Sequence, residues 1–218
     1  SGTVTFTEYL AYRWQDLLLL IFQHVQIVLI AVAVATVVAV FVGVLVHGRA
    51  VPRQLVLTVT ATMLTIPSFA LFGLLIPLLG LGLLPTISAL TFYAIFPILR
   101  NVITGLESVP AEVEEAARGM GLSVRRRMLV VRVPLAWPVL LNGVRVATIM
   151  CVGIAAIAAA VNGPGLGELI FEGLARIGGA NALNSTLTGV IGVAVVALLL
   201  DLLFVLISRL TTSRGIRD

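Results

Sequence analysis

The chain has 218 residues, of which 60% are hydrophobic and only 11% are charged. Soluble domains carry about 25% charged residues, so this composition excludes a soluble domain and indicates an integral membrane protein. Several apolar runs exceed about twenty residues without strict alternation, which favours membrane-spanning helices. The formal net charge is +4, and the basic residues are all arginine because the sequence contains no lysine.

The basic charge does not indicate a nucleic-acid partner. Most arginines fall in loops that the topology below places on one side, which is the positive-inside pattern of membrane proteins. The single cysteine, Cys151, excludes an internal disulfide and a cysteine-based metal site. His24 and His47 are about 34 Å apart along one predicted helix, so they cannot share a site. We interpret each histidine as a boundary or packing residue, and we expect no metal and no cofactor in this chain.

In chain order, residues 1–22 combine aromatic, charged and leucine residues. This pattern is typical of an amphipathic segment at the membrane interface, and equally of a ragged start to the first span. Pro67 is predicted to kink the second span, because a proline inside a helix removes a backbone hydrogen bond. The five predicted spans are residues 24–46, 54–79, 86–102, 139–161 and 187–210.

The longest polar interval, residues 107–137, separates the third and fourth spans. Ser108 followed by Pro110 predicts the start of a short helix, and Gly119 with Gly121 predicts its end. A second, arginine-rich helix is expected to follow. We interpret the interval as a cytoplasmic docking loop, because a short helix across the end of the bundle offers a rigid surface to a partner. The alternative is a loop whose charges serve topology alone.

The spacing within this loop carries a resemblance. Glu115, Ala116 and Ala117 are followed after three residues by Gly121, and after nine more by the run that ends at Pro134. This string resembles the EAA loop of the membrane subunits of ATP-binding-cassette importers, with valines in place of the family's isoleucine and leucine. The resemblance implies an ATPase-coupling role for a set of loop residues, namely Glu115, Ala116, Ala117, Arg118, Gly119, Met120, Gly121 and Pro134.

The wider sequence, about residues 20–210, resembles permeases for osmoprotectants and other quaternary amines such as glycine betaine, carnitine and choline. One departure is the string from Asn162 to Gly167, where such permeases tend to have G-A-G-G-L-G and this chain has Pro164. The resemblance implies three kinds of partner: a second permease copy or a homologue, a cytoplasmic ATPase dimer that binds ATP and magnesium, and an extracytoplasmic substrate-binding protein. Membrane lipid surrounds the bundle.

The chain itself is not expected to be an enzyme. A phosphate-binding loop of the G-x(4)-G-K-[S/T] type requires a lysine, and the sequence has none. ATP hydrolysis is therefore expected in another subunit. Two alternatives stay open, which are an importer of the same type for methionine or another amino acid, and a membrane anchor or sensor partner without transport.

Two charges lie inside predicted spans, Arg145 and Asp201. Counted from the same face they are at matching depths of about 10 and 12 Å, so we expect them to form an ion pair that joins the fourth and fifth spans. Candidate residues of the translocation pathway or its gate flank the predicted kink or lie in the string after the fourth span. They are Thr65, Pro67, Ser68, Phe69, Asn162 and Pro164.

The expected fold is therefore all-α: a single permease domain over residues 1–218, with five transmembrane helices and a cytoplasmic coupling loop. Placing the polar interval inside puts the N-terminus outside and the C-terminus in the cytoplasm. Only Arg13 and Arg176 are then basic residues on the outer side. The expected location is the bacterial plasma membrane.

Overall fold

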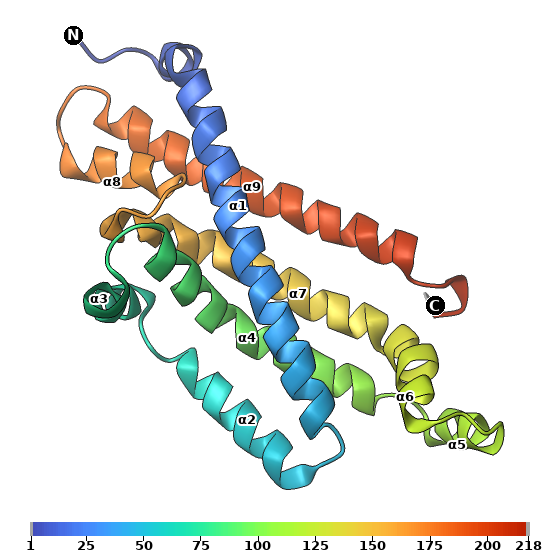
Figure 1. The fold of residues 1–218 in the computed structure, drawn as a ribbon. Helices are drawn as coiled ribbons and strands as arrows, with labels where there is room; N and C mark the ends of the chain where they lie inside the picture. Colours follow the sequence, from blue (N-terminus) through green and yellow to red (C-terminus); the bar gives the residue numbers. More distant parts are fainter. Residues whose placement is uncertain (1, 217–218) are drawn as a thin grey trace.

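The fold is known from a computed structural model that describes residues 2–216. Those residues form helices and no strands, joined by short turns (Figure 1). The elements are α1 (Phe6–Val46), α2 (Ala50–Met63), α3 (Ser68–Leu79), α4 (Leu83–Glu107), α5 (Ala111–Gly119), α6 (Val124–Arg127), the π-helix η1 (Met128–Arg132), α7 (Val133–Ala155), the 3-10 helix η2 (Ala156–Val161), α8 (Gly167–Ala175), α9 (Ala182–Thr211) and the 3-10 helix η3 (Arg214–Ile216).

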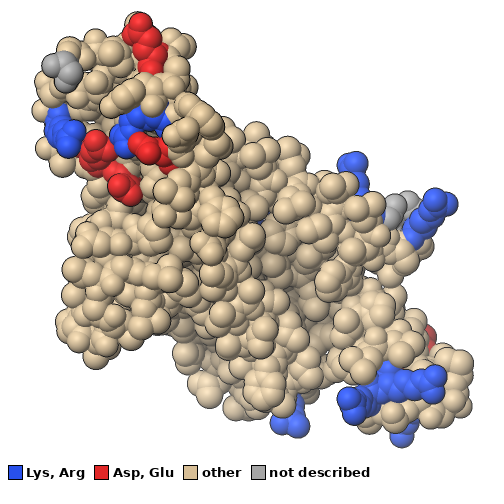
Figure 2. Space-filling view, turned by 45° about the horizontal axis from the view of Figure 1, so that its top comes forward, with Lys and Arg blue, Asp and Glu red and all other residues tan. Residues whose placement is uncertain are grey.

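The predicted all-α membrane bundle is confirmed. Four helical runs are long and apolar enough to cross a membrane: α1, α4, the run Val124–Val161 and α9. The pair α2 and α3 passes the same test together, which gives up to five spans if the pair counts as one. Figure 2 shows charged side chains at the ends of the molecule and a wide band without them between. That distribution matches a bundle whose middle faces lipid.

The first helix begins before the predicted first span, residues 24–46. α1 begins at Phe6 and includes most of residues 1–22 as well as that span, with a kink at Arg13. Its 41 residues amount to about 61 Å of helix. A capping box sets the start, because Thr5 and Glu8 each accept a hydrogen bond from the other's backbone amide. A local departure from helical geometry at Arg13 bends the first turns away from the rest.

The predicted kink at Pro67 is a full break. α2 and α3 meet at 94° across the turn Leu64–Pro67, so residues 54–79 do not form one bent rod. Pro67 lacks an amide hydrogen and disfavours helical geometry at the residue before it, Ile66. The hydroxyl of Tyr93 on α4 donates a hydrogen bond to the carbonyl of Ile66. A carbonyl freed by the break thus has a partner inside the bundle.

α4 lies at the centre of the bundle, between α1 and α7. Glycines allow the close approach of these helices: a Cβ at Gly43 of α1 would lie 2.5 Å from Val102, and one at Gly105 of α4 would lie 2.8 Å from Leu140. Small residues at such crossings are typical of membrane helices, whose association depends on packing rather than on the hydrophobic effect.

α7 and α9 are joined by polar contacts. The predicted pair of Arg145 and Asp201 is present: the guanidinium Nε lies 2.5 Å from Oδ1, and Nη2 lies 3.0 Å from Oδ2. This two-pronged geometry is the strongest that an arginine and a carboxylate form. Nearer the α5 end, the indole of Trp137 donates a hydrogen bond of 2.6 Å to the hydroxyl of Thr211. Both contacts fix α9 against the same side of α7.

Removing either partner of the ion pair leaves the other charge unpaired in a membrane span. Membrane-insertion scales put the free-energy cost of an ionised side chain at the centre of a span at roughly 2.5–3.5 kcal/mol. We therefore expect Arg145→Leu and Asp201→Leu each to lower the thermal midpoint, and the double variant to recover most of the loss. The buried thiol of Cys151 reports unfolding through a thiol-reactive dye. A double variant less stable than both single variants would contradict this assignment.

Candidate functional site

The polar interval folds as the predicted pair of short helices, but its first helix starts later than predicted. Ser108 is the C-terminal cap of α4, and its hydroxyl donates to the carbonyl of Gly105. α5 starts after Pro110, whose side chain cannot cap it. A proline disfavours helical geometry at the residue before it, so a helix cannot run through that point. The acidic Glu112 and Glu114 lie in the first turn, where a negative charge interacts favourably with the helix dipole.

The end of α5 is as predicted. Gly121 has a left-handed backbone with φ of +77°. The amide of Gly121 bonds to the carbonyl of Arg118, and the amide of Leu122 bonds to the carbonyl of Ala117. These two bonds make a Schellman motif, which needs a residue at positive φ and therefore favours glycine. The motif turns the chain sharply towards α6, so Gly121 sets the direction in which the chain leaves α5.

Glu114 ties α5 to the helix that follows it. Its Oε2 accepts a hydrogen bond of 3.1 Å from Arg132 Nε. Its Oε1 lies 3.0 Å from Arg127 Nε as an ion pair without hydrogen-bond geometry. All three side chains are partly buried, so solvent screens these contacts less than it screens fully exposed ones. Sequence reasoning missed this brace, because the partners are up to 18 residues apart and no local spacing signals them.

A second brace lies where α4 ends. Glu107 accepts hydrogen bonds from the backbone amide of Gly48, at 3.0 Å, and from the guanidinium of Arg53, at 2.9 Å. These donors belong to the turn between α1 and α2 and to the first turns of α2. The loop is therefore held on both sides, by Glu107 before α5 and by Glu114 within it.

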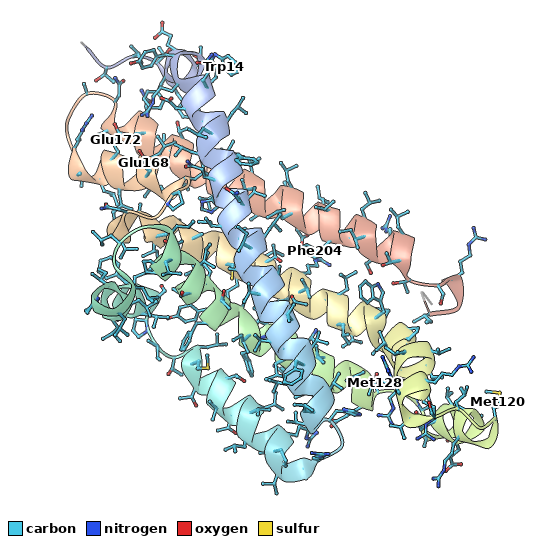
Figure 3. The ribbon with its side chains drawn as sticks, in the orientation of Figure 1. Trp14, Met120, Met128, Glu168, Glu172 and Phe204 are labelled. Carbon is cyan, nitrogen blue, oxygen red and sulfur yellow. The ribbon has the colours of Figure 1, made fainter. Side chains whose placement is uncertain are left out.

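The face of α5 away from the bundle is open. Glu115, Ala116 and Arg118 are exposed, and in the part of the chain described here neither Glu115 nor Arg118 belongs to an ion pair. Met120 is 73% exposed at the tip of the loop, whereas Met128 lies nearer the bundle (Figure 3). An apolar tip beside unpaired charges of both signs is suited to a protein partner.

Three residues of the predicted coupling set do not lie on this open face as a group. Ala117 is only 2% exposed, so it is not free to contact a partner. Gly119 is the last residue of α5 and is exposed. Pro134 lies in the first turn of α7, where a proline is tolerated, and its side chain is exposed.

The predicted pathway residues gather at the end of the bundle opposite α5. Thr65, Pro67, Ser68 and Phe69 lie at the break between α2 and α3, and Phe69 is 63% exposed. Asn162 and Pro164 lie between the end of η2 and the first residue of α8, in residues 162–167, which we call the 162–167 connection. An apolar cluster joins these two regions. Its buried members are Leu71, Phe72, Ala89, Tyr93, Ala158 and Val161.

Comparison with known proteins gives a single family. The family model described as "Binding-protein-dependent transport system inner membrane component" matches residues 35–213. The osmoprotectant import permease protein OsmW of Salmonella typhimurium is 37% identical, over 91% of this chain and 93% of that protein. The choline transport system permease protein OpuBB of Bacillus subtilis is 33% identical, over 96% of this chain and 95% of that protein.

A solved structure has the same fold. The MetNI methionine ABC transporter, in an inward-facing crystal form, matches with a TM-score of 0.77 and 25% identity, over 91% of this chain and 99% of that chain. The chain therefore belongs to the family of inner-membrane components of binding-protein-dependent transport systems, as a permease subunit of an ATP-binding-cassette importer.

Proposed function

We propose that this permease imports an osmoprotectant quaternary amine, such as glycine betaine, choline or carnitine. The names of the relatives OsmW and OpuBB support this solute class, since both match over nearly the whole chain. The observation that carries the coupling role is the brace of α5 by Glu114 beneath an exposed face, next to the end of α4 that Glu107 fixes to the turn before α2. A rigid helix that is open on one side suits transmission of a partner's motion.

The chain is proposed to work with three partners. A separate ATPase dimer, which binds ATP and magnesium, docks on α5 from the cytoplasm. A binding protein delivers the solute from outside, and a second permease copy or a homologue completes the pathway. This arrangement places the N-terminus outside and the C-terminus in the cytoplasm of a bacterial cell. The charges at the α5 end, which are mostly arginine, support that orientation.

In this mechanism, closure of the ATPase dimer displaces α5. Because Glu114 holds Arg127 and Arg132, the displacement reaches the run from α6 to η2; because Glu107 holds Arg53, it also reaches α2. Both routes lead to the opposite end of the bundle. We propose that the break at Pro67 and the 162–167 connection line or gate the pathway there, with Phe69 and Asn162 exposed towards it.

Uptake of radiolabelled glycine betaine into vesicles that hold the permease, its ATPase and its binding protein tests this function. We expect ATP-dependent uptake from the wild type. Gly121→Ala should lose most of it, because a left-handed residue other than glycine is strained by roughly 1–2 kcal/mol and the exit of α5 shifts. Gly215→Ala, outside the loop, is the matched control, since Gly215 is not left-handed, its Cβ would meet nothing within 4 Å and uptake should be kept.

Other outcomes of the same assay point elsewhere. ATP turnover stimulated by the loaded binding protein, without betaine uptake, would retain the importer and replace the solute, for instance by methionine or another amino acid. Neither uptake nor stimulated turnover would favour a membrane anchor or sensor partner. Loss of uptake in both glycine variants would contradict the specific role of Gly121.

Glu114 and Glu115 are adjacent, but Glu114 is partly buried in ion pairs whereas Glu115 is exposed, so their glutamine variants should fail differently. Glu115→Gln removes a charge from the open face, so we expect the ATPase to bind roughly tenfold more weakly. Glu114→Gln breaks the internal brace, so the ATPase should still bind while uptake per ATP hydrolysed falls. Co-purification and coupled uptake and turnover assays measure both. Equal losses of ATPase binding in the two variants would contradict the division.

A further inference from the structure

Of the two interpretations of His24 from the sequence, boundary residue or packing residue, the structure supports the second. It lies 18 residues after the first residue of α1, about 27 Å along the helix, and it is 0% exposed. Polar side chains with no exposure inside a bundle are normally fully hydrogen-bonded, so the partners of this imidazole are informative.

Both ring nitrogens of His24 have backbone partners on other elements. Nδ1 accepts a hydrogen bond of 3.1 Å from the amide of Leu166. An amide can only donate, so Nδ1 carries the lone pair and the proton must be on Nε2. Nε2 lies 2.9 Å from the carbonyl of Val152 and therefore donates to it. The ring is thus the neutral tautomer with hydrogen on Nε2, because an imidazolium has no acceptor for Leu166.

Both partners are groups that their own helices leave open. α7 tightens into the 3-10 turn of η2, and the amide of Ala156 bonds back to the carbonyl of Gly153 rather than to that of Val152. Leu166 is the N-cap of α8, whose first amides have no partner within their helix. One imidazole from α1 therefore satisfies the last turn of α7 and the first turn of α8 together.

The backbone around the ring is shaped to receive it. Gly165 has φ of +121°, and a Cβ there would come within 2.8 Å of His24 Nδ1. On the other side of the 162–167 connection, the amide of Gly82 bonds to the carbonyl of Val161 at 2.7 Å. The amide of Gly163 bonds to the carbonyl of Ala158 at 2.8 Å. The connection is thus fixed at its start by its own chain and the turn before α4, and at its end by His24.

We propose that His24 is a positioning residue that holds the 162–167 connection against α1 and α7. The positioning role itself does not depend on the proposed function, but its consequence for transport does. During transport, any movement of this end of the bundle either keeps or breaks the two hydrogen bonds of the His24 imidazole. With the ring in place, α1, the end of α7 and the start of α8 move together. Without it, the connection can separate from α1.

Backbone hydrogen exchange of the full chain in nanodiscs tests the proposal without requiring transport. In His24→Leu, which keeps bulk and loses both bonds, we expect amides of residues 162–169 to exchange at least about tenfold faster, with residues 111–121 unchanged. His24→Asn places an acceptor near the position of Nδ1 and should restore part of the protection. His47→Leu is the matched control, because among residues 2–216 the His47 side chain has its hydrogen bond with the carbonyl of Val44 in its own helix.

The outcomes separate the inference from the importer function. Unchanged exchange at residues 162–169 in His24→Leu, or an equal rise along the whole chain, would overturn the positioning role. In the assembled transporter, uptake should fall at least about fivefold in His24→Leu and recover partly in His24→Asn; normal uptake in His24→Leu would also overturn it. Absence of uptake from the wild type would instead count against the importer function and leave the exchange result standing.

Discussion

Backbone groups at the helix breaks of this bundle must find partners within the chain, because lipid supplies none. The structure meets this constraint with side chains from distant helices. Tyr93 of α4 closes the break between α2 and α3, and His24 of α1 closes the ends of α7 and α8. The helices can therefore bend or stop inside an apolar bundle without leaving polar groups unpaired. Both sets of breaks lie towards the end of the molecule opposite α5.

Charged and neutral contacts occupy different depths of the bundle. At the α5 end, charged side chains form braces, and Glu107 and Glu114 each contact groups on another element. At the opposite end, Arg13 of α1 pairs with Glu172 of α8. Deeper in the bundle, the neutral side chains of Tyr93 and His24 bond to the backbone in apolar surroundings. This division follows from solvent: ion pairs are tolerated where water is near, and neutral hydrogen bonds carry a smaller desolvation penalty in a dry interior.

The features that could be predicted from the sequence depend on local spacing or on helical periodicity. The spacing from Glu115 to Pro134 located the loop, and equal depth along two spans paired Arg145 with Asp201. The start of α1 was missed, although the Thr5 and Glu8 capping box is visible in the sequence. The 94° break at Pro67 exceeds what a single proline specifies, since it also depends on Tyr93. The role of His24 was out of reach, because its partners lie 128 and 142 residues away.

The π-helical turn η1 has a consequence for how this chain tolerates insertions and deletions. Such a turn accommodates one residue more than an α-helix would at the same place. Each residue of α-helix turns the chain by about 100°, so deleting one residue from the plain α-helical part of α7 would rotate the loop by that angle relative to the spans. The same deletion within Met128–Arg132 would instead remove the extra residue and let the run wind as plain α-helix, with Arg127 still near Glu114 and α7 still packed on α4. This turn is therefore a place where the run from α6 to α7 can lose one residue and keep its rotational register.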